Sequence, residues 1–177
     1  MCYKHELARY KGIVEEKLFA IVDGCGAPKD LKSAMRYSLE AGGKRLRPAM
    51  TLYVCEMLDG DIRRALPFAC ALEMIHTYSL IHDDLPCMDN DDYRRGMPSN
   101  HKVFGEANAV LAGDGLLSLA FDTMLAAIAN NPCQGEIKAA QAVSEGAGVQ
   151  GMVAGQKSPV RGIWIRCALY MSTRPAQ

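Results

Sequence analysis

The sequence lacks a net charge and contains few aromatic residues. Its 20 lysines and arginines balance 20 aspartates and glutamates, and the pI is near 6.9. A neutral chain gives no reason to expect nucleic-acid binding, because that function depends on an excess of positive charge. Aromatic residues make up only 7% of the chain, although hydrophobic residues make up 49%. The remaining apolar residues are mainly alanine, leucine and methionine, and this mixture favours helices over sheets.

Paired cysteines, a signal sequence and a long apolar run are also missing. The seven cysteines are scattered and form no Cys-x-x-Cys pair, so we expect reduced thiols rather than a disulfide framework or a zinc site. The opening residues, MCYKHELARYKG, contain no apolar signal-peptide core. No segment reaches the about 20 uninterrupted apolar residues of a membrane helix. We therefore expect a cytoplasmic protein without an integral membrane segment.

Hydrophobic residues recur at helical spacing along most of the chain. The spacing predicts helices over residues 3–22, 30–41, 48–58, 62–83, 107–129 and 134–154. Pro48 is suited to the first turn of a helix, and residues 62–83 are apolar on all sides, as in a buried helix. No alternating strand pattern is visible, and residues 95–106 are expected to be irregular with one helical turn. The sequence therefore predicts an all-α fold with buried central helices.

The segment after the predicted buried helix is crowded with aspartates. Residues 81–96 read IHDDLPCMDNDDYRRG, and lysine is absent from residues 77–92. Carboxylates this close repel one another, and Mg²⁺ would compensate, since it binds one or two carboxylates together with substrate phosphates. Asp83 and Asp89 would stand about 240° apart on an ideal helix, but Pro86 distorts the turn and could let them converge. A solvated acidic loop is the alternative interpretation.

A basic segment precedes these aspartates in the sequence. AGGKRLRP, residues 41–48, places three cations between a glycine turn and a predicted helix start, namely Lys44, Arg45 and Arg47. Helix N-termini bind phosphate, and lysine and arginine reinforce that binding. An ordinary basic loop is the alternative. Together, the acidic and basic segments suggest a substrate that carries diphosphate groups.

Three further polar residues have separate expectations. His76 lies seven residues before Asp83, on nearly the same helix face, and could hydrogen-bond a diphosphate oxygen. The alternative for His76 is a core histidine with its hydrogen bonds satisfied. His101 is expected to make a structural hydrogen bond. Asp114 is expected to be buried and hydrogen-bonded, without a chemical role.

Three stretches of the chain together resemble one protein family. They read GGKRLRP (42–48), EMIHTYSLIHDDLPCMDNDDYRRG (73–96) and NHKVFGEANAVLAGDGLL (100–117). They resemble the polyprenyl synthetase family of trans-prenyltransferases, and within it the bacterial farnesyl diphosphate synthases. The resemblance implies an all-α isoprenoid-synthase bundle around a large central cavity. It also implies head-to-tail condensation of isopentenyl diphosphate with an allylic diphosphate, dimethylallyl or geranyl diphosphate, with release of pyrophosphate.

The resemblance implies a role for each residue that matches a motif. DDLPCMD resembles the first aspartate-rich motif, so Asp83 and Asp89 would ligate Mg²⁺ and Asp84 would support them. Arg94 would contact the allylic diphosphate, and it completes the implied catalytic set with the three aspartates. Isopentenyl diphosphate would be held by Lys44, Arg47, His76 and Arg95. Mg²⁺ and the arginines would stabilise the charge that develops on the departing pyrophosphate.

The resemblance also bears on product length and assembly. Residues just upstream of the first aspartate motif set the floor of the chain-length pocket in the family, and here they are Tyr78 and Ser79. A bulky Tyr78 would stop growth early, which favours the fifteen-carbon product farnesyl diphosphate. The alternatives are that Tyr78 only packs in the core and that the chain is related to geranylgeranyl diphosphate synthases. Family members are commonly homodimeric.

The residues after Gln156 resemble no part of the family. KSPVRGIWIRCALYMSTRPAQ (157–177) stands where the resemblance leads us to expect a lysine–threonine motif and, later, a second aspartate-rich motif. Read out of frame, with some third bases chosen, the codons of residues 171–177 spell Val-His-Lys-Thr-Gly-Ala, which resembles the family's next functional segment. We interpret residues 1–156 as the N-terminal part of a polyprenyl synthetase domain and 157–177 as a frameshifted, non-native tail. We expect such a chain to be weakly active or inactive.

Two other functions agree with parts of the sequence. A non-catalytic, diphosphate-binding partner subunit would need the first aspartate motif without the second. A helical, metal-dependent phosphohydrolase would use His82 and Asp83 as metal ligands. The phosphohydrolase needs His82 as a ligand, so His82→Ala should abolish metal binding, whereas the prenyltransferase depends on Asp83 and Asp89 instead.

Overall fold

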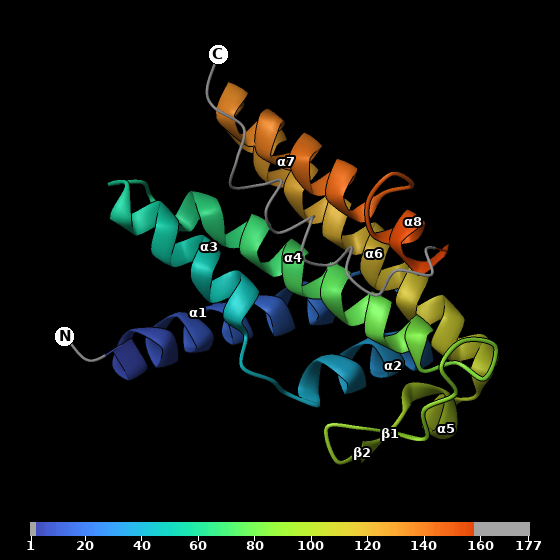
Figure 1. The fold of residues 1–177 in the computed structure, drawn as a ribbon. Helices are drawn as coiled ribbons and strands as arrows, with labels where there is room; N and C mark the ends of the chain where they lie inside the picture. Colours follow the sequence, from blue (N-terminus) through green and yellow to red (C-terminus); the bar gives the residue numbers. More distant parts are fainter. Residues whose placement is uncertain (1–2, 158–177) are drawn as a thin grey trace. The chain divides into compact units, whose positions relative to one another are not determined.

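The computed structural model describes residues 3–157 as two compact units that meet within one helix, the first ending at Ala127 and the second beginning at Ile128. The elements are α1 (Tyr3–Gly24), α2 (Lys29–Glu40), α3 (Leu46–Met57), α4 (Ile62–Asp83), β1 (Tyr93–Arg94), β2 (Met97–Pro98), α5 (Asn100–Phe104), α6 (Glu106–Asn130), α7 (Gln134–Ala147) and α8 (Met152–Lys157) (Figure 1). The all-α prediction is confirmed. Of the residues interpreted as a non-native tail, Lys157 ends α8 and residues 158–177 lie outside the described residues.

The helix boundaries follow local signals in the sequence. α4 begins after Asp61, whose carboxylate accepts the backbone N–H of Arg63 at 2.9 Å and so caps the helix. α3 begins at Leu46, and Pro48 lies in its first turn, where a missing N–H costs nothing. β1 and β2 were not predicted, because strands of two residues are too short to show alternation.

The predicted helix over residues 134–154 is interrupted in the second unit. α7 ends at Ala147 and α8 begins at Met152, with a tight turn between them. A Cβ atom on Gly151 would lie 2.1 Å from the carbonyl oxygen of Gly146, so a side chain at that position would clash with the backbone. The prediction of one helix over residues 134–154 was therefore wrong in its second half, because the glycines in that half form a turn.

The core of the first unit is formed by α1, α3 and α4, which contact one another, while α2 contacts α1 and α4. α1 contributes Tyr10, Val14, Leu18 and Val22, which recur every four residues and are all buried. α4 is buried along most of its length, as its apolar sequence predicted. Figure 1 shows the β1–β2 hairpin and α5 near the end of α4, where the predicted site residues lie.

Arg45 connects several of these helices from inside the core. Its side chain is fully buried, and its Nη1 donates to Glu73 of α4 at 2.7 Å. Its Nε donates to Glu15 of α1 at 3.1 Å, and its Nη2 donates to the carbonyl oxygen of Leu39 in α2. The backbone of Arg45 has a φ of 48°, in the left-handed region, immediately before α3 begins. A buried charge with three acceptors can stabilise a strained residue in this position.

Replacing Glu73 by glutamine should destabilise the first unit strongly. The substitution keeps the shape of the side chain but removes the charge beside Arg45, and breaking one partner of a buried pair costs about 3–5 kcal/mol. Urea unfolding followed by circular dichroism measures the change in the free energy of unfolding.

The matched control is Glu40→Gln, which removes an exposed partner of Arg36 on α2. Exposed pairs at this spacing contribute about 0.5 kcal/mol or less. Equal effects of the two substitutions would show that the Arg45–Glu73 pair does not stabilise the unit.

Candidate diphosphate site

A basin of about 460 Å³ opens beside the turn that joins α2 to α3. Its walls come from that turn, from α4 and from the hairpin, and the lining residues are Ala41, Gly43, Lys44, Arg45, Leu46, Arg47, Glu73, His76 and Arg95. The structure therefore brings together the residues predicted to hold isopentenyl diphosphate, which are Lys44, Arg47, His76 and Arg95. Four cations and one carboxylate line the basin, so its potential favours a polyanion.

The cations in the basin divide into paired and available groups. Arg45 is fully buried and bound to Glu73, whereas its neighbours Lys44 and Arg47 are exposed. Within residues 3–157, neither Lys44 nor Arg47 nor Arg95 forms an ion pair. These three side chains are consequently the ones that can bind an anion.

Glycine at position 43 gives Arg95 its place in the basin. Gly43 has a φ of +138°, and a Cβ atom there would lie 2.7 Å from Nη1 and 2.9 Å from Cζ of Arg95. The guanidinium group therefore lies directly against the glycine backbone. Arg95 and Gly96 both have positive φ, of 54° and 81°, as the central residues of a type I′ hairpin turn require.

Crowded positive charge also shifts the titration of groups in the basin. Burial, together with the positive charge of Arg47, lowers the pKa of His76 to about 4, against a smaller opposing effect of Glu73. Desolvation lowers the pKa of Arg95, and so does the charge of Arg45. His76 is therefore neutral at neutral pH, and a bound anion would relieve the repulsion in the basin.

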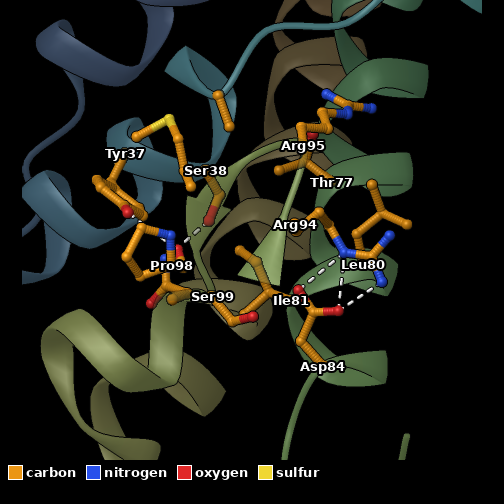
Figure 2. Close-up of a pocket in the computed structure, with 13 residues that line it drawn as sticks. Tyr37, Ser38, Thr77, Leu80, Ile81, Asp84, Arg94, Arg95, Pro98 and Ser99 are labelled. Atoms are coloured by element: carbon orange, nitrogen blue, oxygen red, sulfur yellow. Dashed lines mark hydrogen bonds and ion pairs between the residues drawn. The ribbon is translucent and has the colours of Figure 1, made fainter. Parts of the chain in front are cut away.

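Asp84 and Arg94 form a second, paired part of the site. Nε of Arg94 donates to both carboxylate oxygens of Asp84 at 2.8 Å, and its Nη2 donates to Oδ1 at 2.5 Å (Figure 2). Asp84 is buried, and its hydrogen bond raises the pKa of Arg94. Figure 2 shows Arg94 directed toward Asp84 and Arg95 directed away from it. Asp84 therefore holds Arg94, and its predicted support of Asp83 and Asp89 stays a prediction.

Asp83 and Asp89 lie beside each other at the end of α4. The backbone N–H of Asp89 donates to the carbonyl oxygen of Asp83 at 2.8 Å, across a turn that contains Pro86. This turn brings the two backbones together, where a continuing helix would have separated the residues. That the two carboxylates converge, as expected from Pro86, stays a prediction. Asp89 is exposed and Asp83 is half-buried.

The donor chemistry of these two aspartates fits Mg²⁺. They offer carboxylate oxygens, which Mg²⁺ prefers, and this ion usually takes its other ligands from water and substrate phosphates. Within the described part of the chain, no three histidine, cysteine or acidic side chains are placed to hold a metal ion. A metal at this position would thus be shared with a bound diphosphate.

His82 does not face these aspartates. Its Nε2 lies 3.0 Å from the carbonyl oxygen of Val110 in α6. A Cβ atom on Gly113 would lie 2.2 Å from Nε2, so the ring lies against the α6 backbone. The imidazole thus packs between α4 and α6. This placement does not support a phosphohydrolase that uses His82 as a metal ligand.

Two predictions for polar residues were wrong. The side chain of Asp114 is 60% exposed and lies 3.8 Å from Nε2 of His82, where a buried group was expected. His101 is buried, but neither ring nitrogen has a hydrogen-bond partner among residues 3–157, where a structural hydrogen bond was expected. The error for Asp114 arises because an apolar run does not reveal which face of its helix is covered.

Tyr78 and Ser79 are buried on α4 and do not line the basin. The ring of Tyr78 packs edge-on against that of His82 with centroids 5.6 Å apart, and the hydroxyl of Ser79 donates to the carbonyl oxygen of His76 at 2.9 Å. Their role in product length stays a prediction. Sequence reasoning missed Glu73, although it is the single acidic residue within the apolar run 65–81.

Several known proteins are similar to this chain in sequence and in fold. Residues 28–158 match the family model described as Polyprenyl synthetase. The chain is 51% identical to a farnesyl diphosphate synthase of Geobacillus stearothermophilus over 158 residues, which cover 88% of this chain and 53% of that protein. It is 57% identical to a heterodimeric geranylgeranyl pyrophosphate synthase large subunit 1 of Arabidopsis thaliana over 132 residues, covering 73% of this chain and 35% of that one.

The structure agrees with these sequence relatives. It superposes on the crystal structure of a geranyltransferase from Legionella pneumophila with a TM-score of 0.83 at 40% identity, over 87% of this chain and 54% of that one. The chain therefore spans about half the length of that protein and of the Geobacillus synthase. The predicted isoprenoid-synthase type of helical fold is confirmed, and the chain belongs to the polyprenyl synthetase family.

Proposed function

We propose that the chain carries the diphosphate-binding part of an isoprenoid prenyltransferase. The proposed reaction is the Mg²⁺-dependent condensation of isopentenyl diphosphate with dimethylallyl or geranyl diphosphate, which yields farnesyl diphosphate. The observation that carries this proposal is the basin in which Lys44, Arg47 and Arg95 converge on His76 without ion-pair partners among residues 3–157. The names of the relatives agree with this chemistry.

The basin residues would bind isopentenyl diphosphate. The three available cations would neutralise the two phosphate groups, and arginine adds paired hydrogen bonds to phosphate oxygens. His76 is uncharged at neutral pH and would donate one hydrogen bond. Because Gly43 lets Arg95 approach the turn, the cations would contact the ligand from two sides.

The paired part of the site would bind the allylic diphosphate. Asp83 and Asp89 would hold Mg²⁺, which would stabilise the negative charge that develops on the departing pyrophosphate. Arg94 would face the same diphosphate, since its fork-like pair with Asp84 fixes the orientation of its guanidinium group. A donor fixed in advance stabilises developing charge without reorganising during the reaction.

Product length and assembly extend this proposal. A buried Tyr78 near the end of α4 supports a fifteen-carbon product, whereas the name of the Arabidopsis relative favours a geranylgeranyl product as the second candidate.

We also propose a homodimer in the cytoplasm. α6 is long and apolar enough to cross a membrane by length and composition, and 28% of its apolar window is buried. The absence of an integral membrane segment therefore stays a proposal.

Replacing Gly43 by alanine should weaken the binding of inorganic pyrophosphate. The new methyl group would displace the Arg95 guanidinium, and we expect the dissociation constant to rise about tenfold, which corresponds to ~1.4 kcal/mol. Isothermal titration calorimetry measures this constant. The matched control is Gly105→Ala, because Gly105 also has a positive φ, of 81°, and a Cβ atom there meets nothing within 4 Å. Unchanged affinity in Gly43→Ala would contradict the placement of Arg95 at the diphosphate.

His76 should make stability and binding depend on pH. Its pKa, about 4 in the folded protein, lies below the ordinary value of 6.5, so the unfolded chain binds a proton first as the pH falls. Stability should therefore decrease between pH 6.5 and 4, on the order of 2 kcal/mol after discounting for partial exposure. His76→Gln should remove this decrease, whereas the exposed His5→Gln should not.

Pyrophosphate binding should be accompanied by proton uptake at His76 near pH 5.5, because the bound anion raises the pKa of the imidazole. Calorimetry in buffers with different ionisation enthalpies measures the number of protons taken up. The same uptake in His76→Gln as in the wild type would place the proton elsewhere.

Mg²⁺ should tighten pyrophosphate binding through Asp83 and Asp89. Asp83→Asn and Asp89→Asn should each remove most of this enhancement, about tenfold or more in affinity, because a carboxylate ligand contributes charge that an amide does not. Asp59→Asn, in an exposed turn after α3, is the matched control. Equal Mg²⁺ dependence in all variants would contradict the assignment of these two ligands.

Turnover separates the prenyltransferase from the non-catalytic alternative. The assay supplies labelled isopentenyl diphosphate, geranyl diphosphate and Mg²⁺ to the purified chain. A farnesyl product that disappears in Asp83→Asn supports the proposed reaction. Magnesium-dependent binding of pyrophosphate without any product supports a diphosphate-binding subunit.

A further inference from the structure

The hairpin that carries Arg94 and Arg95 is too small to hold its own shape. β1 and β2 contain two residues each, paired as Tyr93 with Pro98 and Arg94 with Met97. An isolated two-stranded hairpin is at best marginally stable in water, even when it is longer than this one. The position of Arg95 in the basin must therefore be fixed by contacts with other elements.

α2 supplies several of those contacts. The hydroxyl of Tyr37 donates to the carbonyl oxygen of Pro98 at 2.9 Å. Just after the hairpin, Nδ2 of Asn100 lies 2.8 Å from both the carbonyl oxygen of Ala34 and the hydroxyl of Ser38. Figure 2 shows Tyr37 and Ser38 beside Pro98 and Ser99. The C-terminal side of the hairpin is thus docked on α2.

The same helix leads directly into the glycine turn. α2 ends at Glu40, and Gly42, Gly43 and Lys44 follow. α2 is therefore joined to Lys44 through the chain and to the Arg95 hairpin through side-chain hydrogen bonds. One helix consequently connects Lys44 with the hairpin that carries Arg95, and both residues line the basin.

We propose that Tyr37 and Asn100 are positioning residues, which dock the arginine hairpin on α2 and so hold Arg95 opposite Lys44 at the spacing that a diphosphate needs. Neither residue lines the basin; both line the smaller pocket drawn in Figure 2, which they share with Arg94 and Arg95. Their hydrogen bonds join the hairpin and the residue after it to α2, so they act on the ligand through Arg95. Asp84 has a different task, because its carboxylate holds Arg94. This inference rests on the proposed function, since it assigns the roles of two further residues at the same site.

Tyr37→Phe is the decisive variant because it removes one hydroxyl and keeps the ring that packs against Phe104 at 5.4 Å. We expect the dissociation constant for inorganic pyrophosphate to rise about three- to tenfold, the range for one lost neutral hydrogen bond. The matched control is Tyr53→Phe, an exposed tyrosine on α3, which should leave the constant unchanged. Asn100→Ala should weaken binding as well.

A double-mutant cycle distinguishes positioning from general destabilisation. Tyr37→Phe is also made in an Arg95→Met background, and calorimetry at low temperature keeps all variants folded. If Tyr37 acts through Arg95, the second substitution should have no further effect once Arg95 is absent. A role in stability alone would lower the melting temperature and leave the dissociation constant unchanged.

The outcomes separate this inference from the function on which it rests. Wild-type binding that weakens in Arg95→Met but not in Tyr37→Phe overturns the positioning role alone. An equal loss from Tyr37→Phe in both backgrounds also overturns it, because the effect would not pass through Arg95. A wild-type chain that does not bind pyrophosphate overturns both proposals.

Discussion

The buried ion pair between Arg45 and Glu73 is the interaction on which the site depends. Arg45 joins α1, α2 and α4 through Glu15, the carbonyl oxygen of Leu39 and Glu73. A cation removed from water is stable only when acceptors surround it, so these helices must meet at the turn that begins α3. The left-handed backbone of Arg45 then directs its two basic neighbours outward into the basin.

Pairing decides which cations can act on a ligand. Glu73 neutralises Arg45 and Asp84 neutralises Arg94, so their charges are fixed in place. Lys44, Arg47 and Arg95 have no such ion-pair partners in the described residues. Burial and the charge of Arg47 lower the pKa of His76, and burial and the charge of Arg45 lower the pKa of Arg95. A site that binds diphosphate has to keep this unfavourable arrangement, and the docking of the hairpin on α2 maintains it.

Much of the fold could be predicted from the sequence. The bounds of α4 were predicted correctly, because a long apolar run ends where the aspartates and Pro86 begin. The motif resemblance selected Lys44, Arg47, His76 and Arg95, and the structure brings these residues together. The hairpin and the break between α7 and α8 were missed, since strands of two residues and glycine turns depend on contacts that periodicity does not record.

The sequence by itself determined the helices, the family and the two charged segments, because periodicity, capping and motif spacing are local properties. Only the tertiary structure decided which of two neighbouring residues of the same charge is buried or paired. Arg45 and Arg47 stand two positions apart, yet one is buried and the other exposed. Asp83 and Asp84 are adjacent, yet Asp84 is the one that holds Arg94. The physical reason is that burial and pairing depend on helices distant in sequence, which no local pattern encodes.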